Sequence, residues 1–80
     1  MKLSEIVAYR VRDLLIERNM TQAQLERAST LHHGTMNDLL RGMNKGVNYR
    51  TIHLIIRGFG MKAHEFFNDS IFDRDDIEVD

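Results

Sequence analysis

The chain has 80 residues and no cysteine, so we expect one small domain without disulfides or a thiolate metal site. No apolar stretch approaches the ~20 residues of a membrane span. The charged N-terminus lacks the apolar block of a signal peptide, so we expect a soluble cytoplasmic protein. The chain has no proline, and its apolar residues repeat with a helical period. These patterns predict an all-α fold.

The charge is distributed unevenly along the chain. The formal net charge is −1, but residues 1–67 have a balance of +4 and residues 68–80 a balance of −5. A mildly basic body with an acidic tail fits a protein that binds phosphates. It equally fits an ordinary domain with a solvated acidic end. We therefore divide the chain into a body, residues 1–67, and an acidic C-terminal tail, residues 68–80.

Two helices are predicted in the first 31 residues. The first has Ser4 as its expected N-cap, ends near Asn19, and has a core-facing stripe at Val7, Val11, Leu14 and Leu15. Thr21 and Gln24 have the spacing of a capping box, so a second helix should begin after Thr21 and run to about Ala28. Residues 29–31 then form a turn.

Three further helices are predicted after this turn. The third begins at His32 or His33 and ends at Arg41, where Gly42 can adopt the left-handed conformation of a helix stop. Residues 43–47 form a loop, and Asn48 is the expected cap of a fourth helix that ends at Gly60. A short fifth helix covers residues 63–67. The tail carries apolar residues among its acids, so part of it is expected to dock on the body or on a partner: Ile71, Phe72, Ile77 and Val79.

The run from Thr21 to Gly42, TQAQLERASTLHHGTMNDLLRG, resembles the helix-turn-helix of the phage-repressor and Cro-type family, also called the xenobiotic-response-element family. Apolar residues match at Leu25, Leu31, Met36 and Leu39, and Gln22 matches the usual glutamine. The later run VNYRTIHLIIRGFGMKAHEFF is similar to the family's fourth and fifth helices. The resemblance covers about residues 5–67. It implies a compact five-helix bundle whose DNA-binding domain occupies residues 1–67.

Three positions depart from the family pattern. Glu26 stands where the family usually has alanine between two closely crossing helices, and Thr30 stands where it usually has glycine in the turn. Many members also pair an arginine late in the first helix with a glutamate before the terminal glycine. Here both positions are apolar, Leu15 and Leu40. Replacing a whole ion pair by apolar residues is often neutral or stabilising, so we predict that Leu15 and Leu40 touch in the core.

The resemblance implies that the exposed face of the third helix, about His32–Arg41, reads bases in the major groove. The expected residues are His33, Gly34, Asn37 and Asp38, with Thr35 and Arg41 at the margins. Asn37 can bond to adenine through two hydrogen bonds, and His33 can donate to guanine N7 or O6. Asp38 can accept only from cytosine N4, or it can pair with Arg41 three residues later.

Phosphate contacts are expected from backbone N–H groups and side chains at the start of the second helix. The expected residues are Thr21 and Gln22, then Asn44, Lys45 and Asn48 in and after the loop, with Lys2 and Arg10 extending the footprint. We expect no metal or cofactor, since the histidines lack ligand spacing. No nucleophile with a base and an orienting group is present, so we expect no enzyme.

Two functions follow from these observations. The first is a sequence-specific transcriptional regulator that binds double-stranded DNA as a two-fold homodimer, with half-sites one helical turn apart. Few residues follow the fifth helix, so we expect no ligand-binding domain. The alternative is a protein-interaction module, such as the antitoxin of a toxin–antitoxin pair, with the tail as a possible partner site. Glu26, Asp38 and the acidic tail favour it. A single basic face around the third helix favours DNA, and a mixed face favours the module.

Overall fold

The computed structural model describes residues 1–43 and 47–79. In these ranges the helices are α1 Leu3–Glu17, α2 Gln22–Ser29, α3 His33–Leu40, α4 Tyr49–Gly58 and α5 Ala63–Phe66, and a short 3-10 helix, η1, covers Ser70–Asp73. The predicted all-α fold is confirmed. Within the described part of the chain, no helix is long and apolar enough to cross a membrane.

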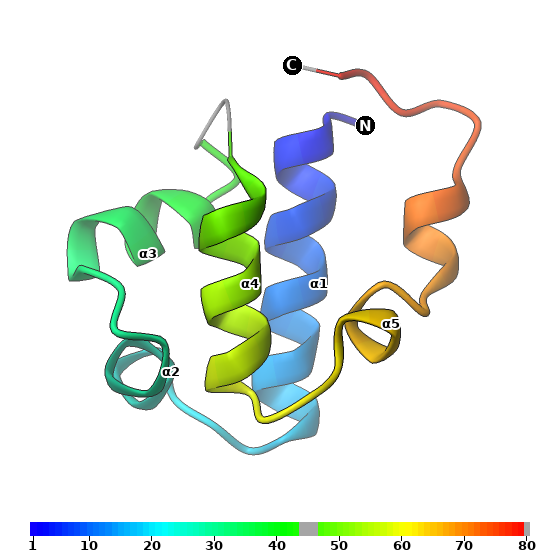
Figure 1. The fold of residues 1–80 in the computed structure, drawn as a ribbon. Coiled ribbons are helices and arrows are strands. Elements are labelled where there is room, and N and C mark those ends of the chain that lie inside the picture. The colour runs from blue at the N-terminus through cyan, green and yellow to red at the C-terminus, as the bar shows by residue number, and fades with distance from the viewer. Residues whose placement is uncertain (44–46, 80) are drawn as a thin grey trace.

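The helices divide the molecule into two sides. In Figure 1, α1 and α4 run through the middle of the view, with α2 and α3 on one side and α5 with the chain that follows it on the other. The contacts agree with this arrangement: α2 packs on α4, α3 packs on α1 and α2, and η1 packs on α1. The helix-turn-helix and the acidic tail therefore occupy opposite sides of the domain.

One apolar cluster holds the helices together. Its fully buried side chains come from the first five helices and include Val11, Leu25, Met36, Ile55 and Phe66. Leu40 is buried in this cluster, and Leu15 packs against it while partly exposed. Both leucines thus belong to the same core, and their direct contact stays a prediction.

Two of the three predicted helix caps are confirmed. Thr21 caps α2, and Asn48 caps α4 by accepting a hydrogen bond from the Thr51 N–H at 2.9 Å. The prediction for Ser4 was wrong, because α1 begins at Leu3 with Lys2 as its N-cap residue. The Glu5 carboxylate reaches back to the Lys2 N–H at 2.8 Å. This contact starts the helix earlier and places Ser4 inside the first turn.

The packing of α2 on α4 depends on a glycine at the end of α4. A Cβ atom at Gly58 would lie 3.1 Å from both the Cβ and the backbone nitrogen of Ser29, and 3.1 Å from a methyl carbon of Leu25. These distances are shorter than ordinary van der Waals contacts, so a residue with a Cβ atom requires its neighbours on α2 to shift by a few tenths of an ångström. Gly58 therefore sets how closely α2 approaches α4.

Arg10 is a structural residue of the side that carries the tail. Its side chain is 9% exposed, and its guanidinium donates to the carbonyl of Phe66 at 2.8 Å and that of Glu65 at 3.0 Å. It also pairs with the carboxylate of Asp69 at 3.2 Å. The expected phosphate contact at Arg10 was wrong, because this side chain supplies donors to carbonyl groups at the end of α5.

The tail docks on the body, one of the two alternatives expected, and Phe72 is the apolar residue that packs against the core, whereas Val79 is exposed. Phe72 packs against the core, with its ring centroid 6.0 Å from that of Phe66 and 5.1 Å from that of Phe67. Further along, the Leu3 N–H donates to the Glu78 carbonyl, and the Glu78 N–H donates to the Met1 carbonyl, each at 2.9 Å. The end of the acidic tail therefore lies beside the start of α1.

Replacement of Arg10 tests its structural role. We expect Arg10→Ala to lower the free energy of unfolding by about 2–3 kcal/mol, because buried carbonyl groups lose a charged donor. Arg12→Ala, an exposed arginine on the same helix, should change it by no more than ~0.5 kcal/mol. Urea denaturation followed by circular dichroism measures both. Equal losses from the two variants would contradict the role assigned to Arg10.

Candidate nucleic-acid interface

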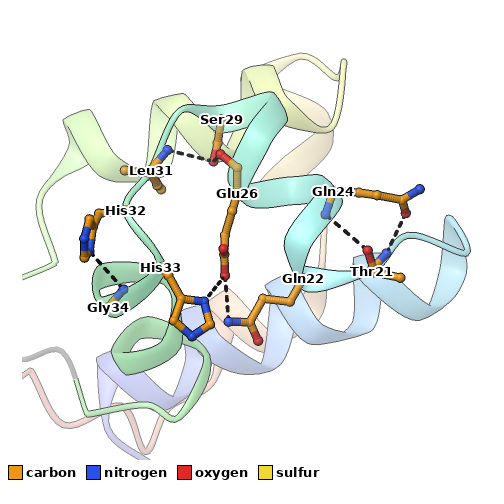
Figure 2. Close-up of polar contacts among 9 residues, drawn as sticks. All are labelled: Thr21, Gln22, Gln24, Glu26, Ser29, Leu31, His32, His33 and Gly34. Atoms are coloured by element: carbon orange, nitrogen blue, oxygen red, sulfur yellow. Dashed lines mark hydrogen bonds and ion pairs between the residues drawn. The ribbon is translucent and has the colours of Figure 1, made fainter.

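The start of α2 is closed by a reciprocal pair of hydrogen bonds. The Thr21 hydroxyl accepts from the Gln24 N–H at 3.1 Å, and the Gln24 side chain accepts from the Thr21 N–H at 2.8 Å (Figure 2). The predicted capping box is confirmed. It also means that the Thr21 N–H is not free for a phosphate, contrary to the expectation. The N–H groups of Gln22 and Ala23, in the first turn, have no acceptor in their own helix.

The turn between α2 and α3 contains a residue other than glycine in the left-handed conformation. Thr30 has φ 62° and ψ 21°, a region that L-residues other than glycine, asparagine and aspartate seldom occupy. The Ser29 hydroxyl, buried beside it, accepts from the Leu31 N–H at 3.4 Å. The turn thus has the left-handed form that glycine would adopt most easily.

A histidine caps α3. His32 precedes α3, and its Nδ1 accepts a hydrogen bond from the Gly34 N–H at 3.1 Å (Figure 2). An imidazole nitrogen can accept only when it carries no hydrogen, so in this contact the hydrogen of the His32 ring is on Nε2. A Cβ atom at Gly34 would lie 3.3 Å from this nitrogen. The small residue therefore leaves room for the cap.

The end of α3 follows the predicted pattern. Gly42 has φ +68°, its N–H donates to the Leu39 carbonyl at 3.0 Å, and the Met43 N–H donates to the Asp38 carbonyl at 3.0 Å. This pair of bonds is the usual glycine-dependent stop of a helix. It ends α3 at Leu40, one residue before the predicted end at Arg41.

The two faces of α3 differ in burial. Met36, Leu39 and Leu40 are buried and attach the helix to the core. The predicted base-reading residues lie on the rest of its surface: His33, Gly34, Asp38 and Arg41 are exposed, and Thr35 and Asn37 are half-buried. The structure therefore brings all six to one helix and its C-cap, with polar groups available to a ligand.

A polar cluster that the sequence did not predict links α2 to α3. Oε2 of Glu26 accepts from the amide nitrogen of Gln22 at 2.9 Å and lies 2.8 Å from Nδ1 of His33 (Figure 2). Gln22 and Glu26 are four residues apart in one helix, a spacing that brings side chains together. The contact with His33 depends on the tight turn, so no sequence spacing predicts it.

The cluster keeps Glu26 ionised. The hydrogen bond from Gln22 lowers the pKa of the Glu26 carboxyl, burial opposes this effect, and the hydrogen bond and charge of His33 lower the pKa further. A lowered carboxyl pKa stabilises the fold above the ordinary glutamate pKa, and this contribution is lost as the pH falls. At neutral pH Glu26 is therefore a carboxylate that accepts hydrogen bonds and donates none.

The matched family agrees with this geometry. The family model of the Cro/C1-type HTH DNA-binding domain matches residues 10–69. The chain belongs to this family. No curated protein and no solved structure is significantly similar to the chain. The match covers the whole helix-turn-helix, α4 and α5, and ends at Asp69, the residue that pairs with Arg10.

The remaining expected site residues of this Cro/C1-type domain have mixed outcomes. Asn48 uses its carbonyl oxygen as the cap of α4, which leaves its amide nitrogen as a donor. Asn44 and Lys45 lie outside the described residues. The expected pairing of Asp38 with Arg41 was wrong: no ion pair joins these two described side chains. The carboxylate of Asp38 is exposed instead.

The left-handed Thr30 gives a test of the turn in this Cro/C1-type domain. We expect Thr30→Gly to raise the free energy of unfolding by about 0.5–1 kcal/mol, because relief of the left-handed strain exceeds the entropy that glycine adds to the unfolded chain. Thr30→Ala keeps the strain, so it should give no gain. Thermal and urea denaturation compare the two. A gain for alanine equal to that for glycine would contradict the strain.

Proposed function

We propose that this chain is a sequence-specific DNA-binding transcriptional regulator that inserts α3 in the major groove. The observation that carries the proposal is the exposed polar face of α3 in a domain of the Cro/C1-type family. A major groove about 12 Å wide admits one helix. In this arrangement Asn37 bonds to adenine, while His33, Gly34, Thr35, Asp38 and Arg41 line the same groove.

The start of α2 contacts the DNA backbone in this proposal. The N–H groups of Gln22 and Ala23 and the hydroxyl of Thr21 lie at a helix N-terminus, where the helix dipole favours a phosphate. Asn48 adds its amide nitrogen from the start of α4, beside the loop that carries Asn44 and Lys45. These contacts orient α3, while the base contacts of α3 select the sequence.

The regulator acts in the cytoplasm as a two-fold homodimer, without catalysing a reaction. Two copies of α3 would then meet half-sites ~34 Å apart on one face of the duplex. The tail runs along α1 on the side opposite α3, so it is free to meet a protein partner without covering the DNA-reading face.

A protein-interaction module, such as an antitoxin, is the second candidate. The exposed carboxylate of Asp38 and the ionised Glu26 favour it, because both put negative charge beside the basic and neutral groups of α3. This face is therefore mixed in sign among the described residues. A mixed face weakens attraction to phosphates and suits a partner that carries both charges.

Selection from a randomised duplex pool separates the two candidates. We expect the protein to enrich a near-palindromic sequence, and Asn37→Ala to lose enrichment at one base pair in each half-site, since a bidentate contact is worth ~1–3 kcal/mol. Asn68→Ala makes the same change at an exposed position after α5 and should leave the sequence unchanged. Weak binding with no enriched sequence would favour the interaction module.

The salt dependence of binding tests the role of Arg41. At the margin of the groove-facing surface, we expect the Arg41 cation to neutralise a phosphate, so Arg41→Ala should reduce the slope of log affinity against log salt by about one for each bound copy. Arg12→Ala provides the control on α1. Fluorescence anisotropy with the selected duplex at several salt concentrations gives the slopes. Identical slopes for Arg41→Ala and the unmodified protein would place Arg41 outside the interface.

A further inference from the structure

Glu26 holds the ring of His33 by one defined nitrogen. The distance from Oε2 of Glu26 to Nδ1 of His33 is 2.8 Å, and within the described residues the ring has no second polar partner on Nε2. The carboxylate side chain is 15% exposed, while that of His33 is 73% exposed. The carboxylate of Glu26 is therefore the less exposed group of the pair, and the imidazole of His33 is the more exposed one.

The chemistry of this contact decides where the hydrogen lies. An ionised carboxylate can only accept, so the nitrogen that faces it must carry a hydrogen. Gln22 donates to the same carboxylate oxygen, which helps to keep Glu26 in its ionised form. Whenever the ring of His33 is neutral, its hydrogen is therefore on Nδ1 and its lone pair is on Nε2.

The preceding histidine has the opposite arrangement. Nδ1 of His32 accepts from the Gly34 N–H, so its hydrogen is on Nε2 when the ring is neutral. Two histidines adjacent in sequence thus differ in tautomer, because one faces a backbone donor and the other faces a carboxylate. This difference supplies an internal reference for any measurement of the tautomer of His33.

On the basis of the proposed DNA-binding function, we propose that Glu26 is a positioning residue that makes the neutral ring of His33 a hydrogen-bond acceptor toward DNA. In the major groove the exocyclic amino groups of adenine and cytosine are the donors. His33 then selects a base pair by its adenine N6 or cytosine N4 amino group. This differs from the expectation that His33 donates to guanine, which requires a hydrogen on Nε2.

The position of Glu26 explains how a carboxylate can lie in a surface that meets phosphates. Two partners engage its oxygen, and one of them is the residue that reads the base. The negative charge of Glu26 repels phosphates, but its carboxylate fixes the orientation of the His33 ring before DNA binds. A group fixed in advance loses less conformational entropy on binding.

Nitrogen-15 NMR of the histidine rings in the intact free protein tests the tautomer without DNA. At about pH 8, above the usual histidine pKa, we expect hydrogen on Nδ1 of His33 and on Nε2 of His32. Glu26→Ala should shift the His33 signals away from the Nδ1–H pattern and leave those of His32 unchanged. Alanine is a strong helix former, so this variant keeps α2. Glu17→Ala, an exposed glutamate of α1, is the matched control.

Duplex selection at the same pH tests the consequence for base choice. We expect the position that His33→Ala relaxes to prefer adenine or cytosine on the contacted strand. Glu26→Ala should weaken that preference about fivefold at the same position, the size of one ordinary hydrogen bond. The double variant should lose no more than His33→Ala alone, because Glu26 acts through His33. Glu17→Ala should leave the preference intact.

Each alternative outcome has a separate meaning. A hydrogen on Nε2 of His33, or on both of its nitrogens, overturns the inference even if the protein selects a sequence. A preference for guanine at the His33 position also overturns it while supporting the proposed function. If the unmodified protein selects no sequence, the proposed function fails and the base choice fails with it, whatever tautomer the NMR spectra show.

Discussion

The contact of α2 with α4 at Gly58 is the constraint on which the half of the molecule that contains α2 and α3 depends. Ser29 and Leu25 meet α4 at Gly58, where an added Cβ atom would lie 3.1 Å from atoms of both residues. Because α2 is held so closely, the turn that follows it begins at a fixed point, and α3 leaves that turn in a fixed direction. The buried face of α3 then packs on α1 and α2, which completes the support of the exposed face.

Much of this half could be predicted from local patterns. The capping box of Thr21 and Gln24 and the glycine stop at Gly42 involve neighbours in sequence, and both were confirmed. The left-handed Thr30 could be anticipated only because the family resemblance showed that glycine is usual there. Ser4 misled the prediction, since a serine near a helix start resembles a cap unless the contact of Glu5 with Lys2 is known.

The roles of charged side chains were the least predictable part. Arg10 looked like a phosphate ligand because it is basic, yet it lies under the end of α5, more than fifty residues away in sequence. Glu26 departs from the alanine that is usual where the two helices cross, yet its carboxylate has two hydrogen-bond partners. Long-range contacts of this kind follow from the tertiary fold, and a spacing rule reports only neighbours within one helix.

The guanidinium of Arg10 also bears on how the domain opens. One side chain joins α1 to the last carbonyls of α5 and to Asp69, just before η1. A fluctuation that releases α5 and the tail therefore breaks the contacts of Arg10 with both carbonyl groups and with Asp69. The free energy of this opening thus depends on a residue of α1. We expect the amide hydrogens of α5 and of the middle of α1 to exchange with solvent as one cooperative unit, whereas the exposed start of α2 exchanges on its own.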